Sequence, residues 1–406
     1  MSSSLPEKNL KKEFVILMAL MTSVMALAID SVLPALSFMN TELDINSIVK
    51  VQYIISVIFI GFGVGQLIYG PMSDAIGRKK PLYIGGLIFL IGCIISFYAE
   101  SLTPMLIGRF LQGLGAASFR IISIAIVRDE YSGVAMARTL SLIMTVFILV
   151  PVLAPSIGQV ILFLGPWRYI FLMLFTLSLI IMIWFYMRQD ETLTSSKRRV
   201  MSIKFFLSAS LEAFTNPISA SATFISGLIF GIMITYISTA QHIFQDIYNL
   251  GTQFPLYFGS LAFTIGLASF VNSFLLKRYG IIRLTKTSLT TMSISSIIFA
   301  SYLTISHTTT PSLVLLMIFF AIFFFCLGLL FGNLNTLALS PLGHIAGIAA
   351  SVIGSVQNFV SVLVGVFIAS IFHNNFITLV LCFAVVTSTS LAIFKFGDYK
   401  KIYQNV

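Results

Sequence analysis

Two side chains of opposite charge lie inside apolar stretches of membrane-spanning length, and together they could move protons. Asp30, in the stretch 14–36, is the one acid of fourteen that cannot be assigned to a loop or to the end of such a stretch. Arg109 lies in the stretch 102–127. Counting 1.5 Å per helical residue from the stretch centres places the two groups at matching depths, about 7.5 and 9 Å outside the midplane. Charges at that depth need a partner or water.

Two interpretations of this pair stay open. A static ion pair would hold two helices together. A proton switch would use the same groups, because burial disfavours the ionised carboxyl and the arginine favours it, so protonation would depend on the direction in which a cavity opens. Arginine keeps its proton in proteins, which makes Asp30 the group that titrates.

Arg120 extends a polar stripe along the same stretch. On a helix, five residues lie within ~40° of one direction: Arg109, Gln112, Ala116, Arg120 and Ser123. A polar stripe in a membrane is expected to face a cavity, which predicts that Arg120, Gln112 and Ser123 contact substrate. The alternative is that Arg120 extends to the membrane interface or pairs with a backbone carbonyl. Two arginines in the cavity would favour neutral or anionic solutes over cations.

Other polar side chains in the apolar stretches are candidate substrate contacts: Thr22, Tyr53, Tyr236, Asn333 and Gln357. The three cysteines lie in separate stretches without metal-ligand spacing, so we predict no metal site. The chain has no phosphate-binding pattern of the form G-x(4)-GK-[ST], and we expect no nucleotide or other cofactor.

The elements that position these residues are predicted to be membrane-spanning helices. Apolar residues make up 58% of the 406, charged residues only 9%, and the mean hydropathy is +1.00, far from a soluble domain. Twelve stretches are long enough to cross the ~30 Å hydrocarbon core as helices: 14–36, 50–72, 82–99, 102–127, 137–162, 166–187, 218–240, 256–276, 286–305, 312–337, 345–371 and 374–394. The fold class is therefore an all-α polytopic membrane protein.

The placement of basic residues predicts the orientation. With both termini assigned to the cytoplasm, 20 of the 24 lysines and arginines fall on the cytoplasmic side. The formal charge of +10 is then a sign of topology, and a nucleic-acid partner is not expected.

A hydrophilic interruption at 188–204 divides six spans from six. We predict five regions: a cytoplasmic tail (1–13), a six-helix bundle (14–187), a linker with a helix on the membrane surface (188–213), a second six-helix bundle (214–394) and a cytoplasmic tail (395–406). The loop with Gly280 and Arg283 repeats the loop with Gly77 and Lys80, as expected for two parallel halves with a site between them.

The loop GPMSDAIGRKK (70–80) follows the second apolar stretch. It contains Gly70, Asp74, Gly77, Arg78 and Lys79 at the spacing G-x(3)-D-x(2)-G-R-K. This pattern resembles the cytoplasmic loop between spans two and three of the major facilitator superfamily. Asp74 could accept from the amides at the start of another helix, and Arg78 could pair with Asp129, beside Arg128, below the fourth span. We predict that these contacts latch a cytoplasmic gate.

The intramembrane motifs narrow the resemblance. Asp30 in D-x(2)-LPAL and Arg109 in R-x-LQG-x-G look like drug/proton antiporters, and GPWRYIF (165–171) and AGIAASVIGSVQ (346–357) extend the similarity to the twelve-span bicyclomycin and chloramphenicol resistance branch (Bcr/CflA type). The resemblance implies two pseudo-symmetric six-helix bundles and proton coupling through Asp30 and Arg109.

The fifth span contains PVLAPSIGQ, with Pro151, Pro155 and Gly158. It resembles the antiporter motif GP-x(2)-GG, with Ala154 and Gln159 in place of the two outer glycines. Proline permits a helix bend, which could be a structural kink or part of a gate.

These observations predict a monomeric exporter in the bacterial inner membrane that exchanges a small neutral or anionic amphiphile for protons. Its partners would be that solute, protons and lipid, and it would not be an enzyme. The alternatives are export of an endogenous carboxylate metabolite such as a siderophore, proton-coupled uptake, and, from another class, a membrane receptor or scaffold that does not transport.

Overall fold

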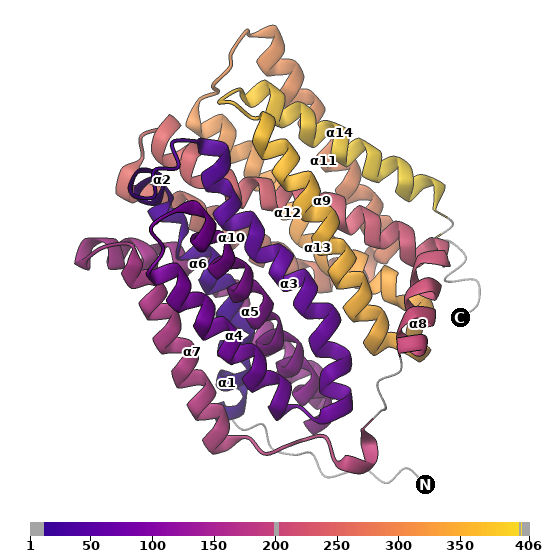
Figure 1. The fold of residues 1–406 in the computed structure, drawn as a ribbon. Helices are drawn as coiled ribbons and strands as arrows, with labels where there is room; N and C mark the ends of the chain where they lie inside the picture. The colour runs from indigo at the N-terminus through magenta and orange to yellow at the C-terminus, as the bar shows by residue number, and fades with distance from the viewer. Residues whose placement is uncertain (1–11, 199–202, 398, 400–406) are drawn as a thin grey trace.

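The computed structural model describes residues 12–198, 203–397 and 399 (Figure 1). Most of both predicted tails and the middle of the predicted linker lie outside these residues. The same is true of five basic residues used to predict the orientation: Lys8, Lys11, Arg199, Lys400 and Lys401.

The first half of the chain forms long apolar helices joined by short loops. They are α1 (Lys12–Asp30), α3 (Ile48–Ile76), α4 (Lys79–Phe97), α5 (Leu102–Glu130), α6 (Gly133–Leu164) and α7 (Arg168–Arg188). Between α1 and α3 lie a 3-10 turn, η1 (Leu33–Ala35), and the short helix α2 (Leu36–Glu42). Helix ends follow local chemistry: the Ser47 hydroxyl accepts from the Lys50 amide at the start of α3, and Gly77, with φ +98°, ends it.

After the turn η2 (Ser195–Lys197), the second half repeats this arrangement. Its helices are α8 (Ile203–Thr215), α9 (Pro217–Gln241) with a π-helical end η3 (His242–Ile247), α10 (Phe254–Tyr279) after the turn η4 (Gly251–Gln253), α11 (Ile281–Ile305), α12 (Leu313–Leu339), α13 (Ala346–Ile371) after the turn η5 (Ser340–Ile345), and α14 (Phe376–Phe396).

Eleven apolar helical stretches in the described residues are long enough to span a membrane. One of them, Leu313–Ile371, has 59 residues, and at 1.5 Å per residue it would be about three times as long as the hydrocarbon core is thick. Non-helical backbone at Leu342 breaks it into α12 and α13. The twelve predicted spans thus correspond to α1, α3 to α7 and α9 to α14, and the predicted all-α membrane fold is confirmed.

The two halves meet along two helix pairs, α3 with α13 and α6 with α10 (Figure 1). Polar contacts join the first pair: the Ser355 hydroxyl donates to the Gly63 carbonyl (2.8 Å), and the Asn358 amide donates to Gln66 Oε1 (2.9 Å). The described parts of the two halves therefore form one bundle with an interface running through its centre.

The ends of the bundle differ. We call them the Arg78 end and the Glu42 end, after the loops that follow and precede α3. At the Glu42 end the halves also meet through η1 and α9, and the Ser56 and Ser238 hydroxyls lie 3.4 Å apart. Toward the Arg78 end, α12 exposes Phe331 and Asn335. At the Arg78 end the halves still approach each other closely, since a Cβ at Gly70 of α3 would lie 2.4 Å from Ser351 Oγ of α13.

Candidate functional site

Arg109 lies at the centre of the first half and is fully buried. Its Nε donates to the Ile54 carbonyl (2.9 Å), and its Nη1 donates to the Ala28 carbonyl (2.8 Å) and to Gln112 Oε1 (2.7 Å). One guanidinium thus joins α1, α3 and α5. The ion pair expected with Asp30 is not formed in the described residues: Nε and Nη1 donate to one carbonyl of α1, one carbonyl of α3 and the Gln112 side chain, and Nη2 has no partner.

Asp30 is the last residue of α1 and is 4% exposed. Within the described part of the chain its carboxyl has neither a hydrogen-bond partner nor an ion-pair partner. Helix α6 comes very close here: a Cβ at Gly158 would lie 2.0 Å from the Ser31 carbonyl oxygen. The helix is continuous through Pro151 and Pro155, and Pro155 and Gly158 lie on its buried side.

Three other polar atoms near this level of the bundle are buried without a hydrogen-bond partner in the described residues: Arg109 Nη2, Gln52 Oε1 and the Tyr236 hydroxyl. Tyr236 belongs to α9 in the second half and lies within electrostatic range of Asp30. Buried polar groups are normally paired, and unpaired ones often mark functional sites. Arg109 of the first half and Tyr236 of the second half therefore both lie near the unpaired carboxyl.

Arg120 lies on α5 about 15 Å from its Glu130 end. Its guanidinium carbon is 5.8 Å from the ring centroid of Phe62 on α3 and 5.2 Å from that of Phe147 on α6. Because α3 and α6 are the helices that meet the second half, Arg120 points toward the interface between the halves. The two rings lie near the middle of α3 and α6, which places the guanidinium inside the bundle rather than at its end.

Most of the other side chains predicted to contact substrate make hydrogen bonds to neighbouring protein groups. Gln112 and Ser123 are fully buried, and the Gln112 amide meets Cys93 Sγ on α4 (3.5 Å), so the stripe does not face a cavity along its whole length. The hydroxyls of Thr22 and Ser123 donate to carbonyls of their own helices. Asn333 pairs with Asn272 on α10.

The remaining two candidates, Tyr53 and Gln357, are half-buried. Tyr236 is buried against three phenylalanine rings, those of Phe258, Phe320 and Phe324. Its ring is therefore part of the packed core of the second half, and only its hydroxyl is left without a partner.

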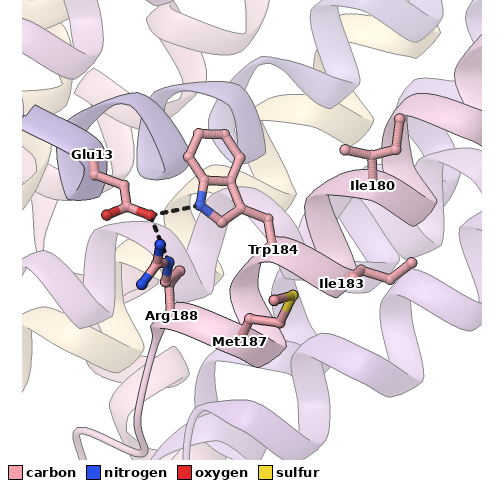
Figure 2. Close-up of a pocket in the computed structure, with 6 residues that line it drawn as sticks. All are labelled: Glu13, Ile180, Ile183, Trp184, Met187 and Arg188. Atoms are coloured by element: carbon pink, nitrogen blue, oxygen red, sulfur yellow. Dashed lines mark hydrogen bonds and ion pairs between the residues drawn. The ribbon is translucent and has the colours of Figure 1, made fainter.

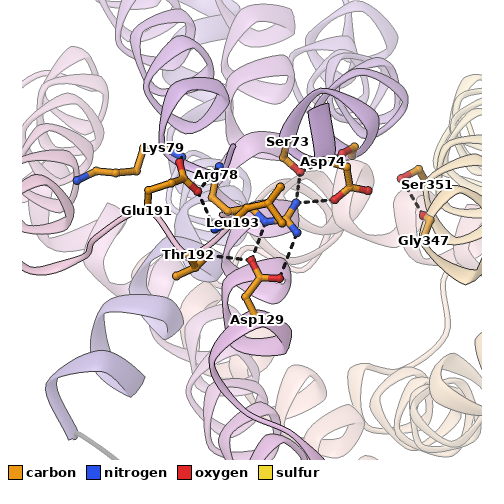
Figure 3. Close-up of polar contacts among 11 residues, drawn as sticks. Ser73, Asp74, Arg78, Lys79, Asp129, Glu191, Thr192, Leu193, Gly347 and Ser351 are labelled. Atoms are coloured by element: carbon orange, nitrogen blue, oxygen red, sulfur yellow. Dashed lines mark hydrogen bonds and ion pairs between the residues drawn. The ribbon is translucent and has the colours of Figure 1, made fainter. Parts of the chain in front are cut away.

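Arg78 is the centre of a polar network outside the spans (Figure 3). Its Nε and Nη2 donate to the two oxygens of Asp129 (2.8 and 3.2 Å), and its Nη1 donates to Asp74 Oδ1 (2.6 Å) and Ser73 Oγ (2.9 Å). The predicted Arg78–Asp129 pair is present. Burial opposes the charge, but the hydrogen bonds to Asp129 and Asp74 raise the pKa of Arg78 above its usual range.

Glu191, in the linker, is a member of this network that the sequence reasoning missed. Its carboxylate accepts from the backbone amides of Arg78 (2.8 Å), Lys79 (3.1 Å) and Leu193 (3.0 Å), so it caps the start of α4. Burial opposes its ionisation, but these amides and Arg198 lower the pKa of Glu191 below its usual range. Gly77 must be glycine here, since φ is +98° and a Cβ would lie 2.6 Å from Glu191 Oε2.

A family model described as Major Facilitator Superfamily matches residues 18–366. The chain belongs to this superfamily. It is therefore a multi-pass membrane transporter of small molecules and not an enzyme, as the sequence analysis predicted.

Two relatives within the superfamily cover most of the chain. One is an uncharacterized MFS-type transporter, YdgK, of Bacillus subtilis (strain 168), 30% identical over 347 residues, which are 84% of this chain and 85% of that one. The other is the multidrug resistance protein MdtL of Escherichia coli (strain SMS-3-5 / SECEC), 28% identical over 322 residues, or 77% and 78%.

Solved major facilitator structures share the fold at low identity. A D-xylose-proton symporter superposes with a TM-score of 0.75 at 14% identity, covering 97% of this chain and 99% of its own. The human organic anion transporter MFSD10 (TETRAN) superposes with a TM-score of 0.68, also at 14%, with the same coverage. At this identity the likeness shows the fold alone.

A surface pocket of this major facilitator protein lies between α1 and α7 (Figure 2). It holds about 330 Å³ and is lined by Glu13, Ile180, Ile183, Trp184, Met187 and Arg188. Glu13 Oε1 accepts from Trp184 Nε1 and pairs with Arg188 Nε, both at 3.0 Å. Tryptophan and arginine at a helix end are typical of a membrane interface, so this pocket is separate from the groups around Asp30.

Proposed function

We propose that this chain is a proton-coupled exporter of a small neutral or anionic amphiphile, of the drug-efflux type and of the Bcr/CflA branch. It would act as a monomer in the bacterial inner membrane, with its Arg78 end and both termini in the cytoplasm. One observation carries the proposal: Asp30 is a buried carboxyl without a partner, close to an arginine that it does not pair with.

The unpaired carboxyl suits a proton carrier. A carboxylate held in a close ion pair keeps its charge in every state, whereas one without a partner changes protonation when its surroundings change. Asp30 lies where α1 ends, α6 crosses and Tyr236 of the second half comes near. Rocking of the halves would alter these surroundings, so the proton on Asp30 would follow the direction in which the transporter opens.

The energy is sufficient for export. One proton moving across a potential of ~150 mV releases about 3.5 kcal/mol, enough for a roughly 300-fold concentration gradient of a neutral solute. No nucleotide is required in this scheme.

The Arg78 network would act as a brace within the first half and as one part of the gate. Its side-chain bonds join α3, the end of α5 and the linker. The sequence predicts that Asp74 accepts from the start of another helix; among the described residues it pairs instead with Arg78. Its side chain is 41% exposed, and Figure 3 draws it between Arg78 and the start of α13 with Gly347 and Ser351. We propose that Asp74 accepts from the first amides of α13, beginning at Ala346 and Gly347, when the Arg78 end closes.

Everted membrane vesicles test the direction of transport. Respiration acidifies their lumen, and solute entering the lumen corresponds to export from the cell. We expect labelled chloramphenicol or p-aminohippurate, an aromatic monocarboxylate of low membrane permeability, to accumulate in the lumen. A proton ionophore should abolish the accumulation, and vesicles without the protein provide the background. Depletion of both solutes from the lumen would indicate uptake by symport, and movement of neither would contradict export of this solute class.

A further inference from the structure

We propose that Arg120, held between Phe62 and Phe147, binds the carboxylate of an amphiphilic aromatic monoanion. This inference rests on the proposed function for the route of the solute, but the binding itself can be measured without transport. It narrows the solute class from a neutral or anionic amphiphile to an aryl carboxylate.

The position of Arg120 gives access from the interface between the halves. The residue after Phe62 on α3 is Gly63, whose carbonyl accepts from Ser355 of the second half. The residue after Phe147 on α6 is Ile148, which lies against Gly266 of α10. A guanidinium between these two rings therefore lies between the two lines of contact that join the halves, and it remains partly exposed.

The donors of Arg120 are unused. In the described residues it makes no hydrogen bond and no ion pair, and its polar contacts are the two aromatic rings. A ring over a guanidinium attracts the charge but leaves the N–H groups, which point outward in the guanidinium plane, without acceptors. Leaving such donors unpaired inside a protein costs free energy. Two parallel N–H donors match the two oxygens of one carboxylate.

A row of aromatic side chains beside Arg120 accounts for the aromatic part of the ligand. Phe59 lies one turn from Phe62 on α3 and meets Phe230 of α9 edge-on (6.2 Å between ring centroids). Phe230 in turn lies 6.0 Å from Phe331 of α12, which is 43% exposed. Rings from both halves thus extend from the guanidinium across the interface, and an aryl group would stack against them.

A matched pair of ligands tests the proposal on the purified full-length protein in detergent. Calorimetric titration would compare 1-naphthoate with 1-naphthamide, which has the same ring but no charge. We expect the carboxylate to bind at least ~10-fold more tightly, as a charge-assisted bidentate contact should provide. Arg120→Gln should remove that preference by weakening naphthoate binding and leaving naphthamide binding within about twofold.

Further variants keep the test independent of folding. Arg120→Lys retains the positive charge but lacks two parallel N–H donors, so it should recover only part of the preference for naphthoate over naphthamide. Phe147→Leu should weaken both ligands about equally, since it removes a ring and no charge. Arg138→Gln, a change at an exposed arginine of α6, should alter neither. Equal binding of the two ligands by the parent, no binding of naphthoate, or an undiminished preference in Arg120→Gln would overturn the proposal.

The two proposals can fail separately. A carboxylate preference that depends on Arg120, in a protein whose vesicles show no proton-driven accumulation, would retain the binding site and reject export. Proton-driven accumulation of chloramphenicol together with equal binding of naphthoate and naphthamide would retain export and reject the carboxylate site.

Discussion

Arg78 and Arg120 are the same residue type in two regions of one half, and their surroundings are opposite. Arg78, outside the spans, is 6% exposed and its donors meet two aspartates and a serine. Arg120, within a span, has two aromatic rings and no acid within the described residues. A charged side chain that pairs with acids of the same protein stabilises one arrangement of the helices that carry them. A charge without such partners contributes little to folding and is available to a ligand.

Removing Arg78 should have the largest effect on stability. Arg78→Ala leaves the Asp129 and Asp74 carboxylates without their cation, and breaking a buried pair typically costs several kcal/mol. Because Asp74 is well exposed, we expect the free energy of unfolding to fall by about 2 to 3 kcal/mol. Denaturant unfolding in detergent would measure it. A loss no greater than that of the surface variant Arg138→Gln would remove the distinction between the two arginines.

Glu191→Gln should have a smaller effect that depends on pH. The native pKa of Glu191 lies below its ordinary value of 4.5, so its contribution to stability is complete above that pH and disappears as pH falls through the native pKa. We expect a loss of about 0.5 to 1 kcal/mol at pH 7, since the carboxylate is exposed. Thermal unfolding at pH 7 and near pH 4 would show the gap between parent and variant narrowing on acidification. A gap that widens would contradict this assignment.

Arg120→Met should have the smallest effect on stability, and of the opposite sign. Replacing an unpaired interior cation by an apolar chain of similar length removes a desolvation cost, so we expect stability to stay the same or rise by up to about 1 kcal/mol. The same variant should lose the preference for 1-naphthoate. A destabilisation as large as that of Arg78→Ala would mean that the rings need the cation for folding.

The sequence predicted the membrane-spanning helices and which residues lie at the same level of the bundle. The apolar lengths predicted the spans, because helical rise is nearly constant, and Arg109 meets α1 at Ala28, two residues before Asp30. The Arg78–Asp129 pair was predictable because Arg78 follows α3 and Asp129 lies in the last turn of α5, at the same end of the bundle. Their roles in proton coupling and gating stay predictions.

Side-chain partners were harder to predict. Helical spacing predicted that Gln112 lies on the same face of α5 as Arg109, but it could not predict that its amide contacts Cys93 on α4. Arg109 donates to backbone carbonyls of α1 and α3. Every residue has a backbone carbonyl, so the sequence gives no indication of which ones an arginine will bind. Glu191 caps α4 from more than a hundred residues away, a contact that depends on the path of the linker.

The most direct test of the account compares two kinds of movement in proteoliposomes containing Asp30→Asn. One is exchange of labelled for unlabelled p-aminohippurate at equal pH, and the other is accumulation driven by a pH difference, with Asp44→Asn, at an exposed acid, as the matched control. We predict that Asp30→Asn keeps exchange within about threefold of the parent, while its pH-driven accumulation falls to that of liposomes without protein. Asp30→Asn proteoliposomes that accumulate the solute as the parent does would show that Asp30 does not carry the proton.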